Sequence, residues 1–172
     1  MATNAYIDAN NIEKHYGSGE NSIAAVDSVS FQIRMGELTV LMGPSGSGKS
    51  TLLSLLGGLE TVDSGRLRVG NAILSDFTSL ASAKFRRANV GFLFQDAGLL
   101  DRMSIMENVA LPLAYTGMAK KLRYMQARKS LESLGLGQRM DHVPGQLSGG
   151  ERQRAGLARA IITKPKLISS IP

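Results

Sequence analysis

A glycine-rich segment with a lysine and a hydroxyl side chain at fixed spacing could bind phosphate groups. It matches the pattern G-x-x-x-x-G-K-[ST], whose glycines let backbone N–H groups wrap around phosphate oxygens. The lysine reaches the β- and γ-phosphates as a point charge, and the serine hydroxyl binds Mg²⁺. We therefore predict that this P-loop binds a nucleoside triphosphate through Gly43, Pro44, Ser45, Gly46, Ser47, Gly48, Lys49, Ser50 and Thr51.

A second candidate segment, residues 147–154, reads Leu-Ser-Gly-Gly-Glu-Arg-Gln-Arg and opens a predicted helix. Ser148, Gly149 and Gly150 place a hydroxyl and open backbone N–H groups at the positive end of that helix, which are features of phosphate-binding sites. Taken alone, the segment is equally typical of an ordinary serine-capped helix that follows a glycine turn.

The elements that must position these motifs follow from periodicity and turn residues. Segments bounded by Gly, Asn, Ser and Asp predict strands at residues 6–12, 26–33 and 66–69. Continuous apolar runs at 38–42 and 90–94 predict strands buried in a parallel sheet, and 166–170 predicts one more strand. Helices are predicted over 50–56, 80–87 and 151–162.

The middle of the chain is predicted to be helical. Ser104 and Glu107 form a capping-box pattern that opens a helix, which Pro112 bends or ends. Residues 118–134 predict an amphipathic helix with Leu122, Met125, Leu131 and Leu134 as its apolar residues and a basic opposite face. That face is most simply a solvated surface, and contact with a membrane protein or lipid is the alternative.

Together the two motifs resemble the ATP-binding cassette (ABC) ATPases, in which LSGGERQR is the signature sequence, and the resemblance runs from about residue 11 to 166. It implies an α/β fold: a P-loop NTPase core with an antiparallel β subdomain and an inserted helical subdomain. The whole chain, 1–172, would be one ATP-binding domain. Residues 1–95 and 147–172 would form the core with its β subdomain, and 96–146 the helical subdomain.

The same resemblance assigns roles to individual residues. Tyr16 matches the aromatic residue that stacks on adenine, and Gln95 matches the glutamine that contacts Mg²⁺ and the attacking water, so Ser50 and Gln95 would hold the metal. By themselves, Tyr16 is typical of a strand-surface aromatic and Gln95 of a solvated loop residue. In the family, two cassettes sandwich two ATP molecules, which implies a homodimer or a second cassette. The signature contacts would come from Leu147, Ser148, Gly149, Gly150 and Glu151.

Residues 99–113 look like those of the lipoprotein-release, macrolide-export and cell-division group of bacterial cassettes. That resemblance implies coupling of ATP binding and hydrolysis to export or lipoprotein transport through an integral membrane permease subunit. The expected location is cytoplasmic, on the inner face of the plasma membrane. Residues 1–10 have no signal-peptide pattern and no apolar run is long enough to span a bilayer, so work at a membrane would need a partner.

The carboxylates of the family's hydrolytic centre have no match in this sequence. In the family, the strand after the signature helix ends in Asp-Glu-Pro, which positions Mg²⁺ and supplies the general base. Here Ser169, Ser170 and Ile171 occupy that region, and no Asp or Glu follows Glu151. His15 and His142 both precede the signature, so neither matches the family's switch histidine, and both are expected to be surface or packing residues. We predict ATP binding with poor hydrolysis, because losing a general base costs ~10²- to 10⁴-fold in rate.

Two further expectations concern the integrity and class of the protein. The leading hypothesis is a truncated or frameshifted transporter ATPase that lacks the C-terminal part of the core and is therefore marginally stable and prone to associate. One alternative is a non-hydrolytic nucleotide-binding regulator that pairs with a complete cassette. Another is a nucleic-acid-associated cassette, but those usually carry a second cassette, zinc modules or a coiled coil, which are absent from this sequence.

Composition adds only broad limits. The net charge of +6 and the isoelectric point near 9.8 permit an anionic partner, but a modest basic excess is usually a solvated surface. No nucleic-acid partner is expected. The absence of cysteine excludes disulfides and thiolate metal sites.

Overall fold

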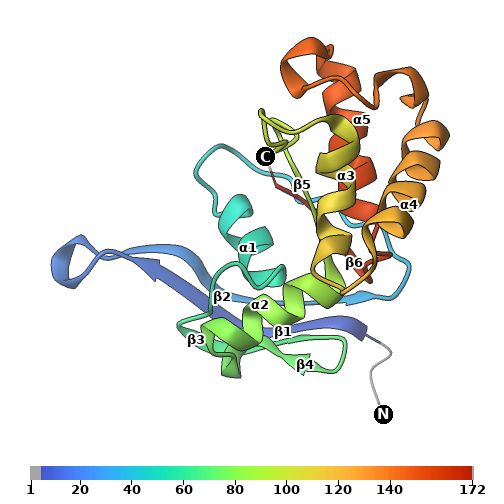
Figure 1. The fold of residues 1–172 in the computed structure, drawn as a ribbon. Coiled ribbons are helices and arrows are strands. Elements are labelled where there is room, and N and C mark those ends of the chain that lie inside the picture. The colour runs from blue at the N-terminus through green and yellow to red at the C-terminus, as the bar shows by residue number, and fades with distance from the viewer. Residues whose placement is uncertain (1–4, 172) are drawn as a thin grey trace. The chain divides into compact units, whose positions relative to one another are not determined.

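The computed structural model describes residues 5–171 and divides into two compact units, the first ending at Arg86 and the second beginning at Arg87 (Figure 1). Residues 1–4, part of the segment predicted to lack a targeting signal, lie outside the described residues, as does Pro172 at the end of the predicted tail. The predicted division into a core at 1–95 and 147–172 and a helical subdomain at 96–146 stays a prediction.

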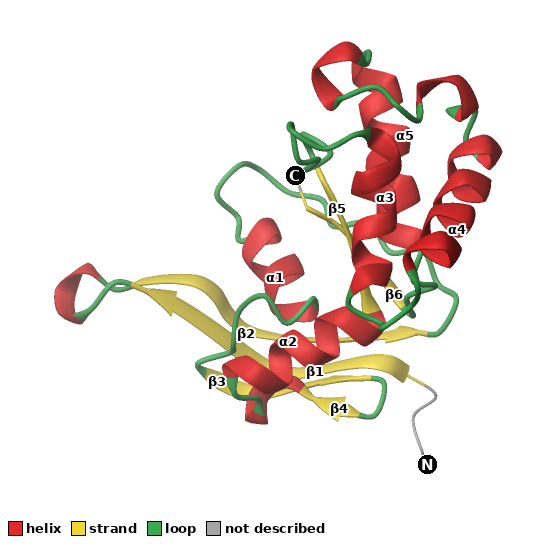
Figure 2. Ribbon diagram, viewed as in Figure 1, coloured by secondary structure: helices red, strands yellow, loops and turns green. Residues whose placement is uncertain are grey.

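The first unit is built on an antiparallel sheet with strand order β2-β1-β3-β4. Strands β1 and β2 form a long hairpin with a short helical turn at its tip (Figure 2). The predicted strands at 6–12, 26–33 and 66–69 are confirmed. The elements are β1 (Ala5–Tyr16), η1 (Gly19–Asn21), β2 (Ile23–Arg34), α1 (Lys49–Leu56), β3 (Ser64–Val69), β4 (Ala72–Ile73) and η2 (Leu74–Asp76), and α2 (Ser79–Asn89) runs across the boundary at Arg86.

The prediction of a buried strand at residues 38–42 is wrong. The segment between β2 and α1 is a loop (Figure 2), and Leu38 and Met42 are 93% and 89% exposed. A strand needs a neighbour that pairs with its backbone groups, and no strand among residues 5–171 pairs with this segment. An apolar run alone therefore did not produce a strand.

The second unit contains a two-stranded parallel sheet and three helices. Strand β5 pairs with β6 in a register that places Phe92 beside Ser169 and Phe94 beside Ile171, which confirms the strands predicted at 90–94 and 166–170. Its elements are β5 (Val90–Phe94), α3 (Ile105–Ala114), α4 (Lys120–Ser133), η3 (Gly137–Arg139), η4 (Pro144–Gln146), α5 (Gly149–Ile161) and β6 (Leu167–Ile171).

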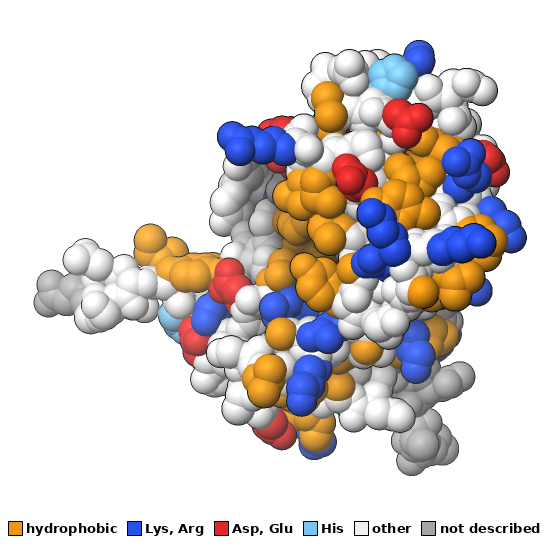
Figure 3. Space-filling view, viewed as in Figure 1, with side chains coloured by type: hydrophobic (Ala, Val, Ile, Leu, Met, Phe, Trp, Pro, Cys, Tyr) orange, Lys and Arg blue, Asp and Glu red, His pale blue; other side chains and the backbone are white. Residues whose placement is uncertain are grey.

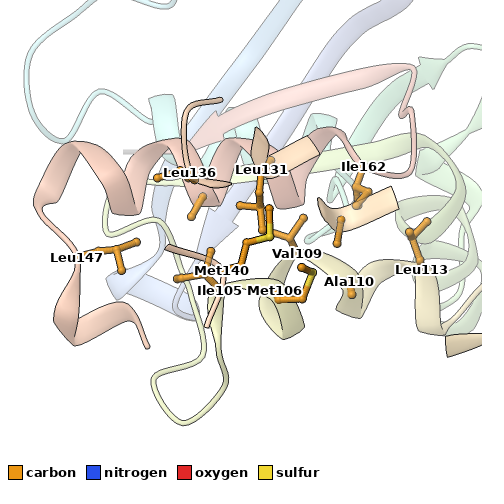
Figure 4. Close-up of a cluster of buried hydrophobic side chains, with 13 residues drawn as sticks. Ile105, Met106, Val109, Ala110, Leu113, Leu131, Leu136, Met140, Leu147 and Ile162 are labelled. Atoms are coloured by element: carbon orange, nitrogen blue, oxygen red, sulfur yellow. The ribbon is translucent and has the colours of Figure 1, made fainter. Parts of the chain in front are cut away.

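A buried apolar cluster holds α3, α4 and α5 together (Figure 4). Val109 of α3, Leu131 of α4 and Ala158 of α5 are completely buried in it. Burial of a Val or Leu side chain contributes roughly 1.5–3 kcal/mol, so these side chains stabilise the second unit substantially. Leu147, the first residue of the signature, belongs to the same cluster and ties that motif to the core.

The middle of the chain forms the predicted helices, one of which buries only part of its apolar face. The capping box of Ser104 and Glu107 is present, and Pro112 lies inside α3, which ends two residues later at Ala114. Leu122 and Met125 of α4 are 48% and 47% exposed, so the apolar face predicted for this helix is only partly buried. Leu131, which was predicted on the same apolar face, is completely buried, and Ala127 is the other buried position of α4. Within residues 5–171, no helix has the length and apolar character needed to cross a membrane.

Candidate functional site

The P-loop lies at the start of α1, where glycines allow backbone conformations that other residues rarely adopt. Gly43, Gly46 and Gly48 have φ values of 154°, 80° and 80°. Gly48 is the N-cap of α1, and a Cβ atom added there would lie only 2.0 Å from the carbonyl oxygen of Ala25 in β2. Position 48 therefore requires glycine both for its left-handed conformation and for its close approach to the sheet.

The Lys49 ammonium group folds back over the P-loop. Its Nζ donates hydrogen bonds to the Gly43 carbonyl at 2.9 Å, to the Pro44 carbonyl and to the Ser47 hydroxyl at 3.2 Å. This places a positive charge over a loop whose glycines leave the backbone accessible. A lysine so placed can bind phosphate oxygens.

The helix start adds donors and a favourable field. The first hydrogen bond of α1 runs from the N–H of Leu52 to the Gly48 carbonyl at 2.8 Å. The N–H groups of Lys49, Ser50 and Thr51 therefore precede the first intrahelical bond and lie at the positive end of the helix dipole. The first turn contains no acidic residue. These donors, the lysine and the exposed Ser50 hydroxyl fit a magnesium-bound polyphosphate.

Tyr16 ends β1, and 42% of the residue is exposed. Its hydroxyl donates a hydrogen bond to a carboxylate oxygen of Glu60, and the Lys14 ammonium lies 5.8 Å from the ring centroid. The hydrogen bond to Glu60, together with burial, raises the pKa of Tyr16 above its ordinary value, and an interaction with the Thr51 side chain lowers it in part. The contact with Thr51 brings Tyr16 together with the P-loop helix. Sequence analysis did not identify Glu60, because its link to Tyr16 spans 44 residues.

Gln95 follows the last residue of β5, and its side chain is exposed. Two side chains of α5 fix the backbone around it. Gln153 donates a hydrogen bond to the Gln95 carbonyl, and Arg159 donates to the carbonyls of Ala97 at 3.0 Å and Gly98 at 2.5 Å. The loop after β5 is thus held by the signature helix, a contact that sequence analysis did not predict.

The signature begins α5 with a complete capping box. The Ser148 hydroxyl accepts from the Glu151 N–H at 3.3 Å, and a Glu151 carboxylate oxygen accepts from the Ser148 N–H at 2.8 Å. Ser148, Gly149 and Gly150 are exposed, whereas Leu147 is buried. The turn therefore exposes a hydroxyl and two glycines to solvent, while the buried Leu147 side chain fixes its position.

Glu151 has a second partner, which is charged. Arg139 of η3 donates from Nε to the other carboxylate oxygen of Glu151 at 2.8 Å. This hydrogen bond, followed by those from Ser148, lowers the pKa of Glu151 to about 2. The carboxylate is thus ionised at neutral pH and bonded at both oxygens. No local sequence pattern marks Arg139, which lies 12 residues before Glu151.

Strand β6 corresponds to the strand that ends in Asp-Glu-Pro in the family. Ser169 is 3% exposed, and its hydroxyl has no hydrogen-bond partner among the described residues. Ser170 is exposed and Ile171 half-buried, so no acidic side chain lies on β6. This part of the second unit offers apolar and hydroxyl groups only.

Of the two histidines, His15 is exposed and His142 is half-buried. His15 of β1 is 41% exposed in its side chain and lies 3.7 Å from a Glu13 carboxylate oxygen. The His142 carbonyl accepts a hydrogen bond from the N–H of Ile105 at 2.8 Å. No cluster of three or more potential metal-binding His, Asp or Glu residues occurs between residues 5 and 171.

Comparisons with known proteins agree with these motifs. The ABC transporter family profile matches residues 26–169. The lipoprotein-releasing system ATP-binding protein LolD of Pseudoalteromonas translucida is 42% identical over 162 residues, covering 94% of this chain and 70% of that protein. The macrolide export ATP-binding/permease protein MacB of Chlorobaculum tepidum is 46% identical over 162 residues, covering 94% of this chain and 25% of that protein. These relatives confirm the predicted resemblance to the lipoprotein-release and macrolide-export group.

A solved structure agrees as well. The dimeric ATP-binding cassette MJ0796, solved in a post-hydrolysis state with ADP and Pi, matches this fold with a TM-score of 0.88 and 36% identity. The match covers 95% of this chain and 72% of that one. It confirms the predicted P-loop NTPase fold with an antiparallel sheet. From the family profile, the relatives and this structural match, we conclude that the chain belongs to the ABC transporter family of ATP-binding proteins.

Proposed function

We propose that this chain is the ATP-binding subunit of an ABC transporter and acts on a membrane process through an integral membrane permease subunit. The observation that carries the proposal is the Lys49 ammonium over the glycine-rich loop at the start of α1. The names of LolD and MacB add the context of lipoprotein release and export. The corresponding location is the inner face of the plasma membrane.

Each part of the candidate site has a distinct proposed role. The Tyr16 ring stacks on adenine, while Glu60 fixes the orientation of its hydroxyl. Backbone N–H groups of the P-loop and the Lys49 ammonium bind the phosphates. The resemblance to the family supports Ser50 and Gln95, each taken by itself, as Mg²⁺ ligands, and the ion neutralises charge on the phosphates when it is bound.

The signature acts on a second nucleotide. We propose that Ser148, Gly149 and Gly150 receive the phosphates of an ATP held by another copy of the chain or by another cassette. The capped end of α5 supplies the donors, and its dipole favours the negative charge. The dimeric structure of the similar cassette supports this arrangement.

We propose that residues 1–172 bind ATP but hydrolyse it poorly. Residues 152–172 contain no Asp or Glu, and β6 carries Ser169 and Ser170 instead. A carboxylate general base is therefore lacking on this strand, and neither serine can replace it at neutral pH because a hydroxyl does not ionise there.

The same observation favours a second candidate function, a nucleotide-binding regulator that pairs with a complete cassette. Such a chain would contribute its P-loop and signature to a mixed dimer. Adding the chain to a complete cassette in the presence of ATP and Mg²⁺ should then change the ATPase rate of that cassette. An unchanged rate at saturating concentrations of the chain would rule out this candidate.

A nucleic-acid-associated role has less support. On the face drawn in Figure 3, Lys and Arg side chains are scattered among apolar and other side chains rather than gathered in one stripe. Nucleic-acid binding surfaces usually concentrate such charges.

Equilibrium binding of a fluorescent ATP analogue with Mg²⁺ tests the proposed function. We expect saturable binding that unlabelled ATP displaces, and a loss of ~10- to 100-fold in affinity for Lys49→Ala, because a charge-assisted contact to the phosphates is removed. Lys129→Ala, which removes an exposed lysine on α4, is the matched control and should bind like the unmodified chain. Equal affinities for Lys49→Ala and the control would refute binding through the P-loop.

A further inference from the structure

The ion pair between Arg139 and Glu151 links a short helical turn to the start of α5. Arg139 is the last residue of η3 and lies 12 residues before Glu151. The side chain of Glu151 is 19% exposed and that of Arg139 is 44% exposed. The pair is therefore partly shielded from water, where charges interact more strongly than on an open surface.

Glu151 places a negative charge beside a turn that we propose receives phosphate. It occupies the third position of α5, directly after the exposed Ser148, Gly149 and Gly150. A carboxylate there stabilises the free helix but repels an approaching polyphosphate. Glu151 therefore stabilises α5 but disfavours the binding of a polyphosphate at the N-terminus of this helix.

The hydrogen bonds of the Glu151 carboxylate reduce its repulsion of a phosphate group. One Glu151 oxygen accepts from the Ser148 N–H at 2.8 Å, and the other accepts from Arg139 Nε at 2.8 Å. Each carboxylate oxygen thus has a donor, and the guanidinium compensates the negative charge. The N–H groups of Gly149 and Gly150 remain outside the capping box.

Two more arginines of α5 lie close to the same turn. A methyl group added at Gly149 would lie 4.0 Å from a guanidinium nitrogen of Arg152, and one added at Gly150 would lie 3.7 Å from a guanidinium nitrogen of Arg154. Arg152 also donates to the Leu147 carbonyl at 2.6 Å. The Glu151 carboxylate therefore lies beside a turn that also has two guanidinium groups close to it. Compensation of its negative charge should raise the affinity of this turn for an anionic ligand.

We propose that Arg139 is a positioning residue for the signature: it compensates the charge of Glu151 and holds both carboxylate oxygens, so that the turn at Ser148–Gly150 can receive the triphosphate of an ATP bound to a second copy. This inference rests on the proposed function. It predicts that affinity at the signature follows the net charge of the pair, which is zero in the natural chain.

A purely structural role for Arg139 predicts something different. If the guanidinium only fastens η3 to α5, removing either partner or both should weaken the site, because the fastening is lost in each case. Charge compensation instead predicts opposite effects of the two single substitutions. Arg139→Met should weaken binding, Glu151→Gln should strengthen it, and the double variant should return close to the unmodified chain.

The experiment is an NMR titration of the ¹⁵N-labelled chain with ATP and Mg²⁺ at high protein concentration. The amide signals of Gly46 and Gly48 report on the P-loop, and those of Gly149 and Gly150 report on the signature. We expect Arg139→Met to weaken the signature response by about tenfold at low salt, since one uncompensated charge acts beside the phosphates. The P-loop response should stay unchanged.

Salt gives the readout that a structural role would not change. The difference between Arg139→Met and the unmodified chain should shrink at 0.5 M salt, because salt screens partly exposed charges. Arg139→Lys should recover part of the affinity, and thermal unfolding of each variant identifies any that fail to fold. For such a variant, the comparison of Glu151→Gln with the unmodified chain still tests the expected increase in affinity.

The outcomes separate this inference from the proposed function. Loss of the P-loop response in the unmodified chain would overturn both. A P-loop response without any change at Gly149 and Gly150 would overturn only the role of Arg139 and the signature. A double variant as weak as Arg139→Met, or a difference that salt does not reduce, would also overturn charge compensation.

Discussion

The buried hydroxyl of Ser169 offers a direct test of what limits the stability of the second unit. Ser169 lies on β6 with 3% of its surface exposed, and its Oγ has no hydrogen-bond partner among residues 5–171. Burying a hydroxyl without a partner costs about 1–3 kcal/mol. Ser169→Ala removes this cost while it deletes only one heavy atom from the packing.

Two contributions set the expected change in the free energy of unfolding: removal of the unpartnered hydroxyl raises it, and the cavity left behind lowers it. The small cavity left by the oxygen offsets part of the recovered free energy, so we expect Ser169→Ala to raise the free energy of unfolding by about 1 kcal/mol. For a chain of this size, that corresponds to an increase of about 2–4 °C in the midpoint of thermal unfolding.

Ser170→Ala is the matched control, because Ser170 is the exposed neighbour on the same strand. Exposed substitutions of this kind usually change stability by less than about 0.5 kcal/mol. Urea unfolding followed by circular dichroism gives the free energies, and hydrogen exchange of Phe92, which pairs with Ser169, localises the effect to the β5–β6 ladder. A Ser169→Ala variant that is less stable than the unmodified chain, or no more stable than Ser170→Ala, would refute the reasoning.

Three further predictions test local features of the two units. Gly48→Ala should destabilise the fold by at least ~2 kcal/mol in urea unfolding, because the new methyl group meets a β2 carbonyl, whereas Gly46→Ala, with the same φ of 80° and open space, should cost only about 1–2 kcal/mol. Since the pKa of Glu151 is lowered from 4.5 to about 2, its carboxylate stabilises the fold above pH 4.5 and this contribution is lost as the pH falls towards 2. The stability difference from Glu151→Gln should therefore shrink over that range, and a constant difference would contradict the assignment. Glu60→Gln should lower the pKa of Tyr16 in an ultraviolet titration, because the carboxylate that raises it is gone, and an unchanged pKa would show that burial alone is responsible.

Most of the fold could be predicted because the relevant signals are local. The capping box at Ser104 and Glu107 lies within one turn, and its hydrogen bonds are present as the pattern indicates. The glycines of the P-loop likewise indicate a turn into a helix, which α1 confirms. Such signals depend on neighbouring residues and need no tertiary context.

The errors arose where structure depends on distant partners. Residues 38–42 have the apolar run of a buried strand, but strand formation needs a paired neighbour, which the described residues do not provide. Leu122 and Met125 satisfy the helical period but stay about half exposed, whereas Leu131, predicted on the same face, is buried. Periodicity gives the spacing of a face and not what covers it.

In the candidate site, too, local features could be predicted and long-range contacts could not. Its short motifs could be recognised from sequence, but the side chains that support them could not. Glu60 reaches Tyr16 across 44 residues, and Gln153 reaches Gln95 across 58. No spacing rule connects residues so far apart, so these contacts required the structure.

Helix α5 joins two parts of the second unit mechanically. The signature lies at its N-terminus, while Gln153 and Arg159 along its length hold the backbone of Gln95, Ala97 and Gly98. With 13 residues, the helix spans about 20 Å as one stiff rod. A tilt or rotation of this rod must carry the loop after β5 along or break three hydrogen bonds. Because Gln153 lies about one turn from Ser148 of the signature, a displacement of the signature would be transmitted to the backbone of Gln95, and Arg159 near the other end of α5 would carry Ala97 and Gly98 with it.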